Sequence, residues 1–457
     1  MISYTKARRY LESFINYERL TSFRYNSFKL KRMAALAESL GIKLKNSRVI
    51  HIAGTKGKGS TAHFCAYILA SSGYKTGLYT SPHFFDFRER IKIVERRGGK
   101  PERLRESKIS RKEVMDITFN LQNKLKKTEN PLLQRVSFFE VYTALALRYF
   151  MEREVDFIVL ETGLGGRLDA TNIVKPAVSI ITPVGYDHMD KLGYRLEEIA
   201  YEKAGIIKRK VPVVCSLQRP QALKIIKRQC RLKDNDLYIE GRDFTVSGIK
   251  LTRRFTNFDF SFGGLRLANM KIKLKGKNQI QNSACALAAL CVLKNLGLLH
   301  KNIRYGAGAL NCSLPGRFEI LKKDPLIIVD IAHNEASFKS LRENLKIYFP
   351  EKKVIFIFAC SKDKLPAKML KNIRYSELIF TSFSSPRSYD PFLLSEKFPH
   401  RCFVAPSPEK AISEAVRLYT NDSLILISGS FFLVSEAKKI ILGRCREYAA
   451  GRVVLKS

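Results

Sequence analysis

The sequence predicts an α/β protein in two parts: a wound sheet domain that contains a phosphate-binding loop, followed by a smaller Rossmann-like α/β domain. Three observations lead to this fold class. An apolar strand at 49–53 runs into a glycine-rich turn and a helix, strand-like and helix-like stretches alternate along most of the chain, and the alternation restarts after Pro315-Gly316. At 457 residues the chain is also longer than a single domain with one hydrophobic core usually is, so two domains are expected.

Composition excludes two classes of protein. No apolar run is long enough to cross a bilayer, and Met1 begins a basic, aromatic segment without the hydrophobic core of a signal peptide. The nine cysteines form no CxxC pair, which favours reduced, mostly buried thiols over disulfides or a zinc site. We therefore expect a soluble, cytoplasmic protein with no membrane partner.

The chain is strongly basic, with 81 Lys and Arg against 42 Asp and Glu and a formal net charge of +39. Such a surface attracts nucleotides and polycarboxylates, and it attracts nucleic acid without sequence specificity. The alternative is compositional bias, with the charges on solvated faces. We favour bias, because the charges are spread along the whole chain with no basic tail or RGG tract.

The opening segment, to about residue 46, is predicted to be helical. Its apolar residues fall near helical spacing, at Phe28, Leu30, Met33, Leu36 and Leu40, and Gly41 is placed to end the helix. The next strand enters the glycine-rich turn, whose backbone N–H groups and following helix suit a phosphate. The spacing differs from the common Walker pattern, because Ile52 replaces the first Gly and Gly59 separates Lys58 from Ser60. A flexible surface turn is the less favoured alternative.

Further strands of the first part are expected at 75–80, 157–161, 178–182 and 211–215. The pattern between about 236 and 275 changes to short alternating runs, which predict antiparallel hairpins attached to the sheet, and a helix follows at about 282–295. The basic region from Arg96 to Lys112 is predicted to be an exposed insertion or loop.

The second part shows strand signals at 326–330, 354–359, 378–383, 402–405 and 424–428. We place the domains at 1–311, with the phosphate-binding loop, N-terminal helices and small antiparallel sheet, and at 312–457. Because the second domain has no GxGxxG, it is expected to form a substrate wall rather than a second nucleotide site.

Polar residues follow several of these strands. Glu161 ends one strand before a glycine-rich turn, and Asp187-His188 come just beyond the next strand. Ligands collect at the carboxyl ends of parallel strands, so Glu161 is placed to hold Mg²⁺ beside a nucleotide. A solvated Glu and a structural His are the alternatives. Lys203 in an apolar setting and Asp330 after a strand of the second domain suggest two half-sites facing each other across a cleft, one for ATP and one for a substrate.

In this order, several segments closely resemble folylpolyglutamate synthase/dihydrofolate synthase, a branch of the Mur ligase family. They are HIAGTKGKGS (51–60), TSPHFFDFRERI (80–91), SFFEVYTALALRYF (137–150), ETGLGGRLDATN (161–172), DHMDKLG (187–193), EKAGII (202–207), PGRF (315–318) and DIAHN (330–334). The resemblance implies a ligase that converts a pteroate or folate carboxylate into an acyl phosphate with ATP, which the amine of L-glutamate attacks.

The resemblance also implies the residues of the site. Catalytic roles fall to Lys58, Lys203 and His333; nucleotide contacts to Thr55, Lys56, Gly57, Lys58, Gly59, Ser60, Asn282, Arg317 and Asp330; the folate side to His83 and Arg90; and magnesium to Ser81, Glu161, His188 and Lys203 as a carbamate. The implied cofactors are ATP, Mg²⁺ and a monovalent cation, and the partners are small molecules. We expect a monomer without a specific nucleic-acid partner.

Two positions depart from the family, with Asn278 where His is usual and Glu335 where Pro is usual. Neither removes a residue assigned above. A different functional class, a P-loop ATPase acting on nucleic acid, is the alternative that the positive charge suggests. The acidic metal-and-water motif usual in such ATPases is missing from this sequence. The motifs are shared among enzymes that make dihydrofolate and enzymes that lengthen folate tails, so both acceptors stay open.

Overall fold

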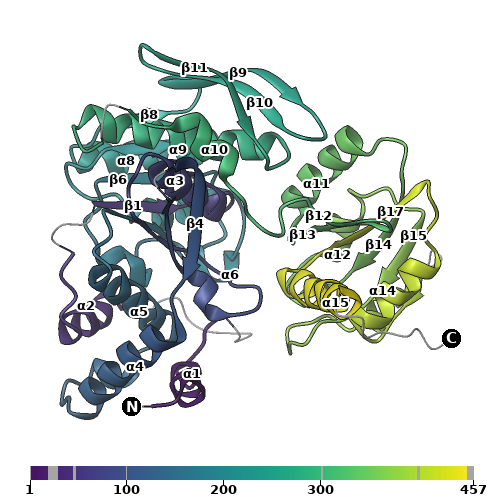
Figure 1. Ribbon diagram of the computed structural model, residues 1–457, viewed down its shortest axis with the longest axis horizontal. Coiled ribbons are helices and arrows are strands. Elements are labelled where there is room, and N and C mark those ends of the chain that lie inside the picture. Colours follow the sequence, from purple (N-terminus) through teal and green to yellow (C-terminus); the bar gives the residue numbers. More distant parts are fainter. Residues whose placement is uncertain are drawn as a thin grey trace. The chain divides into compact units, whose positions relative to one another are not determined.

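A computed structural model describes residues 2–18, 29–44, 48–98, 100–299, 302–398 and 402–449, without the side chains of 101–102 and 444–449. The chain divides into two compact units (Figure 1). The first comprises 1–250, 255–273 and 277–313, and the second comprises 251–254, 274–276 and 314–457. Two short segments inside the small antiparallel sheet region thus belong to the second unit.

The first unit is built on an eight-stranded sheet of order β4-β3-β2-β5-β1-β6-β7-β8. Its strands are β1 (Arg48–Ala53), β2 (Thr76–Tyr79), β3 (Ile91–Arg97), β4 (Lys100–Lys108), β5 (Phe157–Glu161), β6 (Val178–Ile181), β7 (Val213–Cys215) and β8 (Leu237–Ile239). Six neighbouring strands of this sheet, β2, β5, β1, β6, β7 and β8, are parallel to one another. Because β1 lies between β5 and β6, the loops that follow these three strands lie at the same edge of the sheet.

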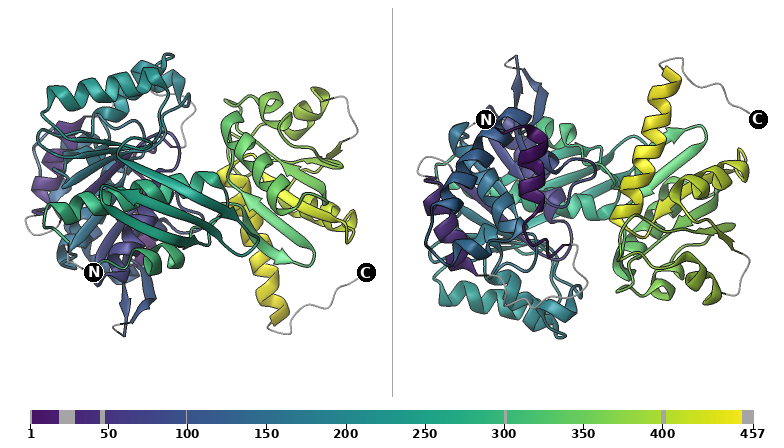
Figure 2. Two further views of the ribbon diagram at one scale, coloured as in Figure 1. Left: turned by 90° about the horizontal axis from the view of Figure 1, so that it is seen from above. Right: turned by 90° about the horizontal axis from the view of Figure 1, so that it is seen from below.

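The region from Arg96 to Lys112, which we predicted to be an exposed insertion or loop, contains regular structure, so the loop alternative is wrong. Its residues complete β3, form the edge strand β4 and begin α4 (Arg111–Lys126). Figure 2 shows this hairpin projecting near the N-terminal label. The abundance of charged residues is compatible with a strand here because an edge strand exposes much of its length, and charges there also discourage further pairing.

The remaining helices of the first unit pack around the sheet. They are α1 (Tyr4–Glu12), α2 (Leu30–Ser39), α3 (Lys58–Ser71), α5 (Phe138–Glu152), α6 (Met189–Leu192), α7 (Leu196–Ala204), α8 (Pro220–Leu232), α9 (Lys277–Asn295) and α10 (Tyr305–Asn311). Helix α3 contacts the sheet, α9 and α10, so residues 60–71 are all buried, as expected for a helix without a polar face. Phe28, part of the predicted opening helix, lies outside the described residues.

The predicted hairpins form a separate three-stranded antiparallel sheet of β9 (Phe244–Leu251), β10 (Thr256–Phe262) and β11 (Leu265–Ile272) (Figure 2). The start of that region differs from the prediction, because β8 pairs in parallel with β7 and extends the main sheet. Alternating burial along β10, with every second residue buried, explains why its sequence pattern was recognisable.

The second unit contains a six-stranded sheet of order β12-β13-β17-β14-β15-β16, parallel except for β12. The strands are β12 (Glu319–Lys323), β13 (Leu326–Asp330), β14 (Lys353–Phe358), β15 (Glu377–Phe380), β16 (Phe403–Val404) and β17 (Ser423–Ser428). The helices are α11 (Glu335–Tyr348), α12 (Pro366–Leu370), α13 (Pro391–Glu396), α14 (Pro408–Arg417) and α15 (Phe431–Ala449). Parallel strands between helices confirm the predicted Rossmann-like fold.

The described cysteines agree with the prediction of reduced thiols. Eight are free, seven of them buried and Cys402 half-buried, while the Cys445 side chain lies outside the description. In the described ranges, no helix has both the length and the apolar character needed to span a membrane.

A buried ion pair ties α2 to α5. Arg32 Nε donates to Glu140 Oε1 at 2.7 Å, and Glu140 Oε2 accepts from the Ser137 backbone N–H at 2.7 Å. The exposed fractions of the two charged side chains are 8% and 4%. We predict that Arg32→Ala lowers the free energy of unfolding of the first unit by roughly 3–5 kcal/mol, because a buried carboxylate loses its partner. Denaturant unfolding followed by circular dichroism measures the loss.

The matched control is Arg417→Ala, whose partner Glu414 lies on the same exposed helix face. An exposed pair of this kind contributes about 0–1 kcal/mol. Equal effects of the two substitutions would contradict a special role for the buried pair.

Candidate active site

The loop after β1 follows a path that only glycine permits at two positions. Gly54 has φ +152°, and a Cβ there would lie 1.9 Å from Thr182 Oγ1. Gly57 has φ +82°, and its Cβ would lie 2.1 Å from Asn282 Oδ1 on α9. Both contacts are far inside van der Waals distance. The glycines at 54 and 57 therefore let the loop pack directly against β6's end and α9.

The loop is hydrogen-bonded to the segment after β6. Thr55 Oγ1 donates to Gly185 O at 3.1 Å and accepts from Gly185 N at 3.0 Å. The backbone N–H groups of Thr55 and Lys56 donate to Pro183 O at 3.0 and 3.3 Å. These two N–H groups are thus used within the protein. The anion-binding capacity of the turn lies instead at the start of α3, where Gly57 provides no side-chain cap for the first N–H groups.

Two lysines share one backbone carbonyl in this loop. Lys58 Nζ donates to Gly54 O at 3.2 Å, and Lys203 Nζ on α7 donates to the same oxygen at 2.9 Å. Burial, followed by the charge of Lys58, lowers the pKa of Lys203 to about 7. A substantial fraction of Lys203 is therefore a neutral, nucleophilic amine near neutral pH.

Glu202, the neighbour of Lys203, is engaged elsewhere. Arg167 binds its carboxylate through Nε at 3.0 Å and through a second nitrogen at 2.8 Å. The carboxylate of Glu202 is thus paired with Arg167, while the Lys203 amine donates to Gly54 O. Lys203 is directed to the glycine-rich loop after β1.

Glu161, at the end of β5, lies against the first turn of α3. A Cβ on Gly59 would be 3.3 Å from Glu161 Oε2, and the Ser81 backbone N–H donates to that oxygen at 3.1 Å. The structure thus brings Ser81, Glu161 and the start of α3 together. Carboxylate and hydroxyl oxygens of this kind fit Mg²⁺, which binds protein through one or two carboxylates and keeps further sites for phosphates.

His188 follows the β6 loop in a left-handed conformation with φ +49° and begins α6. Its backbone N–H donates to Asp187 Oδ1 at 3.1 Å. Across the described residues, no three His, Cys, Asp or Glu side chains gather closely enough to hold a metal. The predicted magnesium set consequently depends on Ser81 and on a carbamate at Lys203 as well as on Glu161 and His188.

His83 and Arg90 contact each other. Arg90 Nε donates to His83 Nδ1 at 2.9 Å, and its two terminal nitrogens bind Glu18 at 2.8 and 2.6 Å. Burial and then the charge of Arg90 lower the pKa of His83 to about 4. His83 is therefore neutral at pH 7, and because Nδ1 accepts, Nε2 carries the hydrogen and can donate.

Asn282 is held on α9 above Gly57. Its Nδ2 donates to Gln279 Oε1 at 3.1 Å, and its backbone carbonyl accepts from Thr61 Oγ1 at 3.3 Å. This position places an amide beside the turn where phosphates would bind.

In the second unit, Asp330 ends β13 and organises the surrounding loops. Its oxygens accept from the backbone N–H groups of Phe318 and Ala332, both at 2.8 Å. Burial raises the pKa of Asp330, and the charge of Arg317 opposes this. His333 Nδ1 donates to Ile331 O at 3.0 Å, which leaves Nε2 as the acceptor in the neutral ring.

Sequence reasoning missed a buried network behind the loops. Asp169 Oδ2 accepts from the N–H groups of Gly163 and Leu164 at 2.9 and 3.0 Å, and Thr171 Oγ1 donates to Asp169 Oδ1 at 2.6 Å. His51 Nε2 donates to Thr171 Oγ1 at 2.8 Å, and burial followed by the charge of Lys208 lowers the pKa of His51 to about 3. The polar residues of the segment DATN (169–172) were the sequence signal that could have predicted this network.

Comparisons with known proteins agree with the resemblance. The sequence model of the Mur ligase middle domain matches residues 52–290, and that of the Mur ligase glutamate ligase domain matches residues 316–431. The dihydrofolate synthase/folylpolyglutamate synthase of Bacillus subtilis (strain 168) is 31% identical over 90% of this chain and 94% of its own length. The folylpolyglutamate synthase of Lacticaseibacillus casei is 30% identical, over 97% and 99%.

Solved structures are similar over nearly the whole length of the chain. The folylpolyglutamate synthase of Thermotoga maritima has a TM-score of 0.79 at 34% identity, covering 96% of both chains. An FPGS–AMPPCP–folate complex has a TM-score of 0.81 at 27% identity, covering 96% of this chain and 100% of the other.

The glycine geometry yields a prediction. Gly57→Ala should weaken ATP binding about tenfold or more, equivalent to 1.4 kcal/mol, because the new Cβ must displace the loop from Asn282. Gly263→Ala is the control, since Gly263 has φ +55° but no atom within 4 Å of its Cβ. Both variants pay about 1–2 kcal/mol for the left-handed backbone. Calorimetric titration with ATP separates them, and equal affinities would show that the Asn282 contact is irrelevant.

Proposed function

Because the chain belongs to the Mur ligase family, we propose that residues 1–311 bind ATP and the pterin acid and that residues 312–457 bind L-glutamate and add the nucleotide contacts Arg317 and Asp330. The enzyme is an ATP-dependent ligase of the folylpolyglutamate synthase/dihydrofolate synthase branch, which joins glutamate to dihydropteroate or folate. The observation that carries the site proposal is the pair of lysines on the Gly54 carbonyl, beside the uncapped start of α3. The nucleic-acid alternative finds no support among the relatives.

The reaction needs an activated acid. A carboxylate is a poor electrophile until one of its oxygens becomes part of an acyl phosphate, and charge accumulates on the transferred phosphoryl group during that step. We assign Lys58 and the first N–H groups of α3 to this charge, because both are fixed before ligand binds. The amine of glutamate then attacks the acyl carbon, phosphate leaves, and an amide forms.

We assign Mg²⁺ to Ser81, Glu161, His188 and a Lys203 carbamate. When bound, Mg²⁺ would neutralise phosphate charge. The neutral fraction of Lys203 can add carbon dioxide, releasing one proton and converting a buried cation beside Lys58 into a carboxylate. That change removes the repulsion between the two lysines. The monovalent cation and the monomeric state stay predictions.

In the first unit, Thr55–Ser60 and Asn282 are the proposed nucleotide contacts. Since the Thr55 and Lys56 N–H groups already bind Pro183 O, the backbone contribution of these two residues is structural. His83 Nε2–H is proposed to donate to the pterin acid, oriented by Arg90.

In the second unit, Arg317 and Asp330 are the proposed nucleotide contacts, and His333 is proposed to meet glutamate and the acyl phosphate. Its Nδ1–H is fixed by Ile331 O, so the Nε2 lone pair can accept a proton from the attacking amine. Glu335, where the family usually has Pro, pairs with Lys339 and Lys371 at 3.3 Å each and begins α11.

The first test of function is substrate omission. ADP release should require a pterin acid and L-glutamate together, because the acyl phosphate is consumed only by the amine. Coupled assays with dihydropteroate, folate and folate polyglutamates also identify the acceptor. Full turnover without glutamate, or stimulation by DNA or RNA instead, would refute the ligase assignment.

Replacing Lys58 by Ala should lower kcat by roughly 10²-fold, as for other single groups that stabilise transition-state charge. Lys112→Ala on α4 is the control for loss of one exposed cation. Steady-state kinetics of ADP release compare the two. Near-normal turnover of the Lys58 variant would mean that the phosphates bind elsewhere.

Replacing Lys203 by Ala should remove most activity while circular dichroism stays unchanged, and acetate or bicarbonate should restore part of it by supplying a carboxylate ligand. The control is Lys208→Ala, since Lys208 Nζ also donates to a backbone carbonyl, that of Asn172 at 2.8 Å. Acetate should not raise the activity of that variant. Identical responses in both variants would argue against a carbamate.

A further inference from the structure

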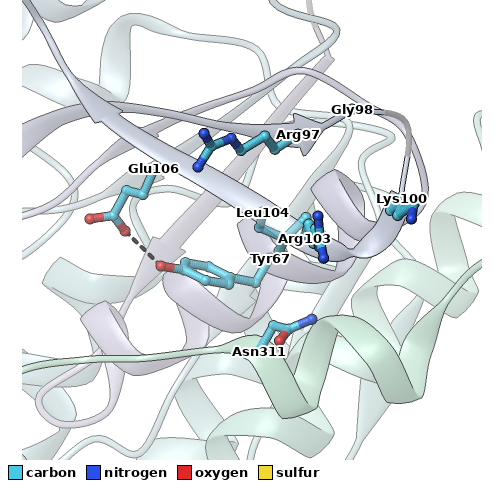
Figure 3. A pocket seen from close by; sticks show the side chains of 8 residues that line it. All are labelled: Tyr67, Arg97, Gly98, Lys100, Arg103, Leu104, Glu106 and Asn311. Atoms are coloured by element: carbon cyan, nitrogen blue, oxygen red, sulfur yellow. Dashed lines mark hydrogen bonds between the residues drawn. The ribbon is translucent and has the colours of Figure 1, made fainter.

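The basic hairpin of β3 and β4 forms one wall of a cavity of about 670 Å³ in the first unit. Tyr67 of α3 and Asn311 at the end of α10 face it from the other elements, and Arg97, Lys100 and Arg103 come from the hairpin (Figure 3). None of these residues belongs to the proposed catalytic machinery. The cavity size lies in the range of about 300–1,000 Å³ that is usual for small-molecule sites.

The cations of the hairpin differ in what they contact. Lys92 of β3 pairs with Glu106 of β4 at 2.8 Å, which joins the two strands of the hairpin. Arg96 Nε donates to Ser71 O at 3.0 Å, which holds the hairpin to α3. The side chains of Arg97, Lys100 and Arg103 are exposed, and they make no ion pair or hydrogen bond with any residue that the structure describes. Three like charges around one cavity repel each other, and an anion between them would relieve that repulsion.

The floor of the cavity is fixed, and Glu106, the one acid among the described lining residues, is already paired. Tyr67 is 8% exposed, and its hydroxyl donates to Glu106 Oε2 at 2.9 Å, shown as the dashed line in Figure 3. The other oxygen of Glu106 binds Lys92. Glu106 therefore does little to offset the three cations, and its bond to Tyr67 keeps the ring in place as an aromatic wall.

We propose that this cavity binds a small oligoanion with two or more carboxylate or phosphate groups, at a site separate from the ATP site. Tyr67 follows Lys58 by nine residues on α3, which corresponds to about 13 Å at 1.5 Å per residue. The two Arg side chains offer bidentate donors to either kind of anion. A γ-glutamyl chain, which a ligase of the proposed function makes when it lengthens folate tails, and a polyphosphate are the two sources of this chemistry.

The test is calorimetric titration of the full-length chain with tri-γ-glutamate and, separately, with tripolyphosphate, at a saturating concentration of a non-hydrolysable ATP analogue. The pocket variant is Arg97→Gln/Lys100→Gln/Arg103→Gln. The matched control is Lys224→Gln/Lys227→Gln/Arg228→Gln, which removes three equally exposed cations from α8. The pocket variant should weaken binding at least tenfold, the control less than twofold, and both should keep the wild-type kcat.

If wild-type protein binds only tri-γ-glutamate, the site is specific for carboxylates, and if it binds only tripolyphosphate, the site is specific for phosphates. Binding of both probes shows that the site accepts both kinds of anion. If the triple variant misfolds, the single variant Arg103→Gln replaces it, and we expect its loss of affinity for the probe to lie between those of the wild-type protein and a folded triple variant. The proposal is wrong if wild-type protein binds neither probe, or if the control variant loses as much affinity as the pocket variant, because the hairpin would then be an ordinary solvated basic surface.

Discussion

The polar site of the first unit depends on the position of one backbone carbonyl, that of Gly54. It accepts from Lys58, four residues away, and from Lys203, 149 residues away. Two amines on one buried oxygen repel each other when both are charged, which contributes to the lowered pKa of Lys203. The carbonyl can take this position only because residue 54 has no Cβ to collide with Thr182. One glycine thus fixes both the loop path and the chemistry of two lysines.

The loops around this carbonyl are ordered by the protein itself. Thr55 is bound to Gly185, and Asp169 holds the N–H groups of Gly163 and Leu164, so the segments after β1, β5 and β6 are hydrogen-bonded before any ligand is present. Buried His51 and Thr171 lock Asp169 in turn. Such support keeps catalytic groups in place and lowers the reorganisation needed during phosphoryl transfer.

The high positive charge serves several separate purposes. Arg32 and Arg90 are buried in ion pairs that join distant segments, and Lys58 and Lys203 both donate to the Gly54 carbonyl of the glycine-rich loop. Many other cations are exposed, as the compositional explanation expects. The charge of the hairpin is different, since it surrounds a cavity rather than a convex surface.

The sequence by itself determined the two wound sheets, the glycine turn at 54–59 and the positions of Glu161 and Asp330 at strand ends, because burial period and turn chemistry are local properties of the chain. Only the tertiary structure decided that Arg96–Lys112 is mostly a hairpin, that 251–254 and 274–276 join the second unit, and that Lys203 reaches Gly54. It likewise decided that Arg90 pairs with Glu18 and that Asp169 supports the glycine loop. These outcomes depend on which strands become neighbours, and local periodicity reports how deeply a residue is buried but not which distant residue buries it.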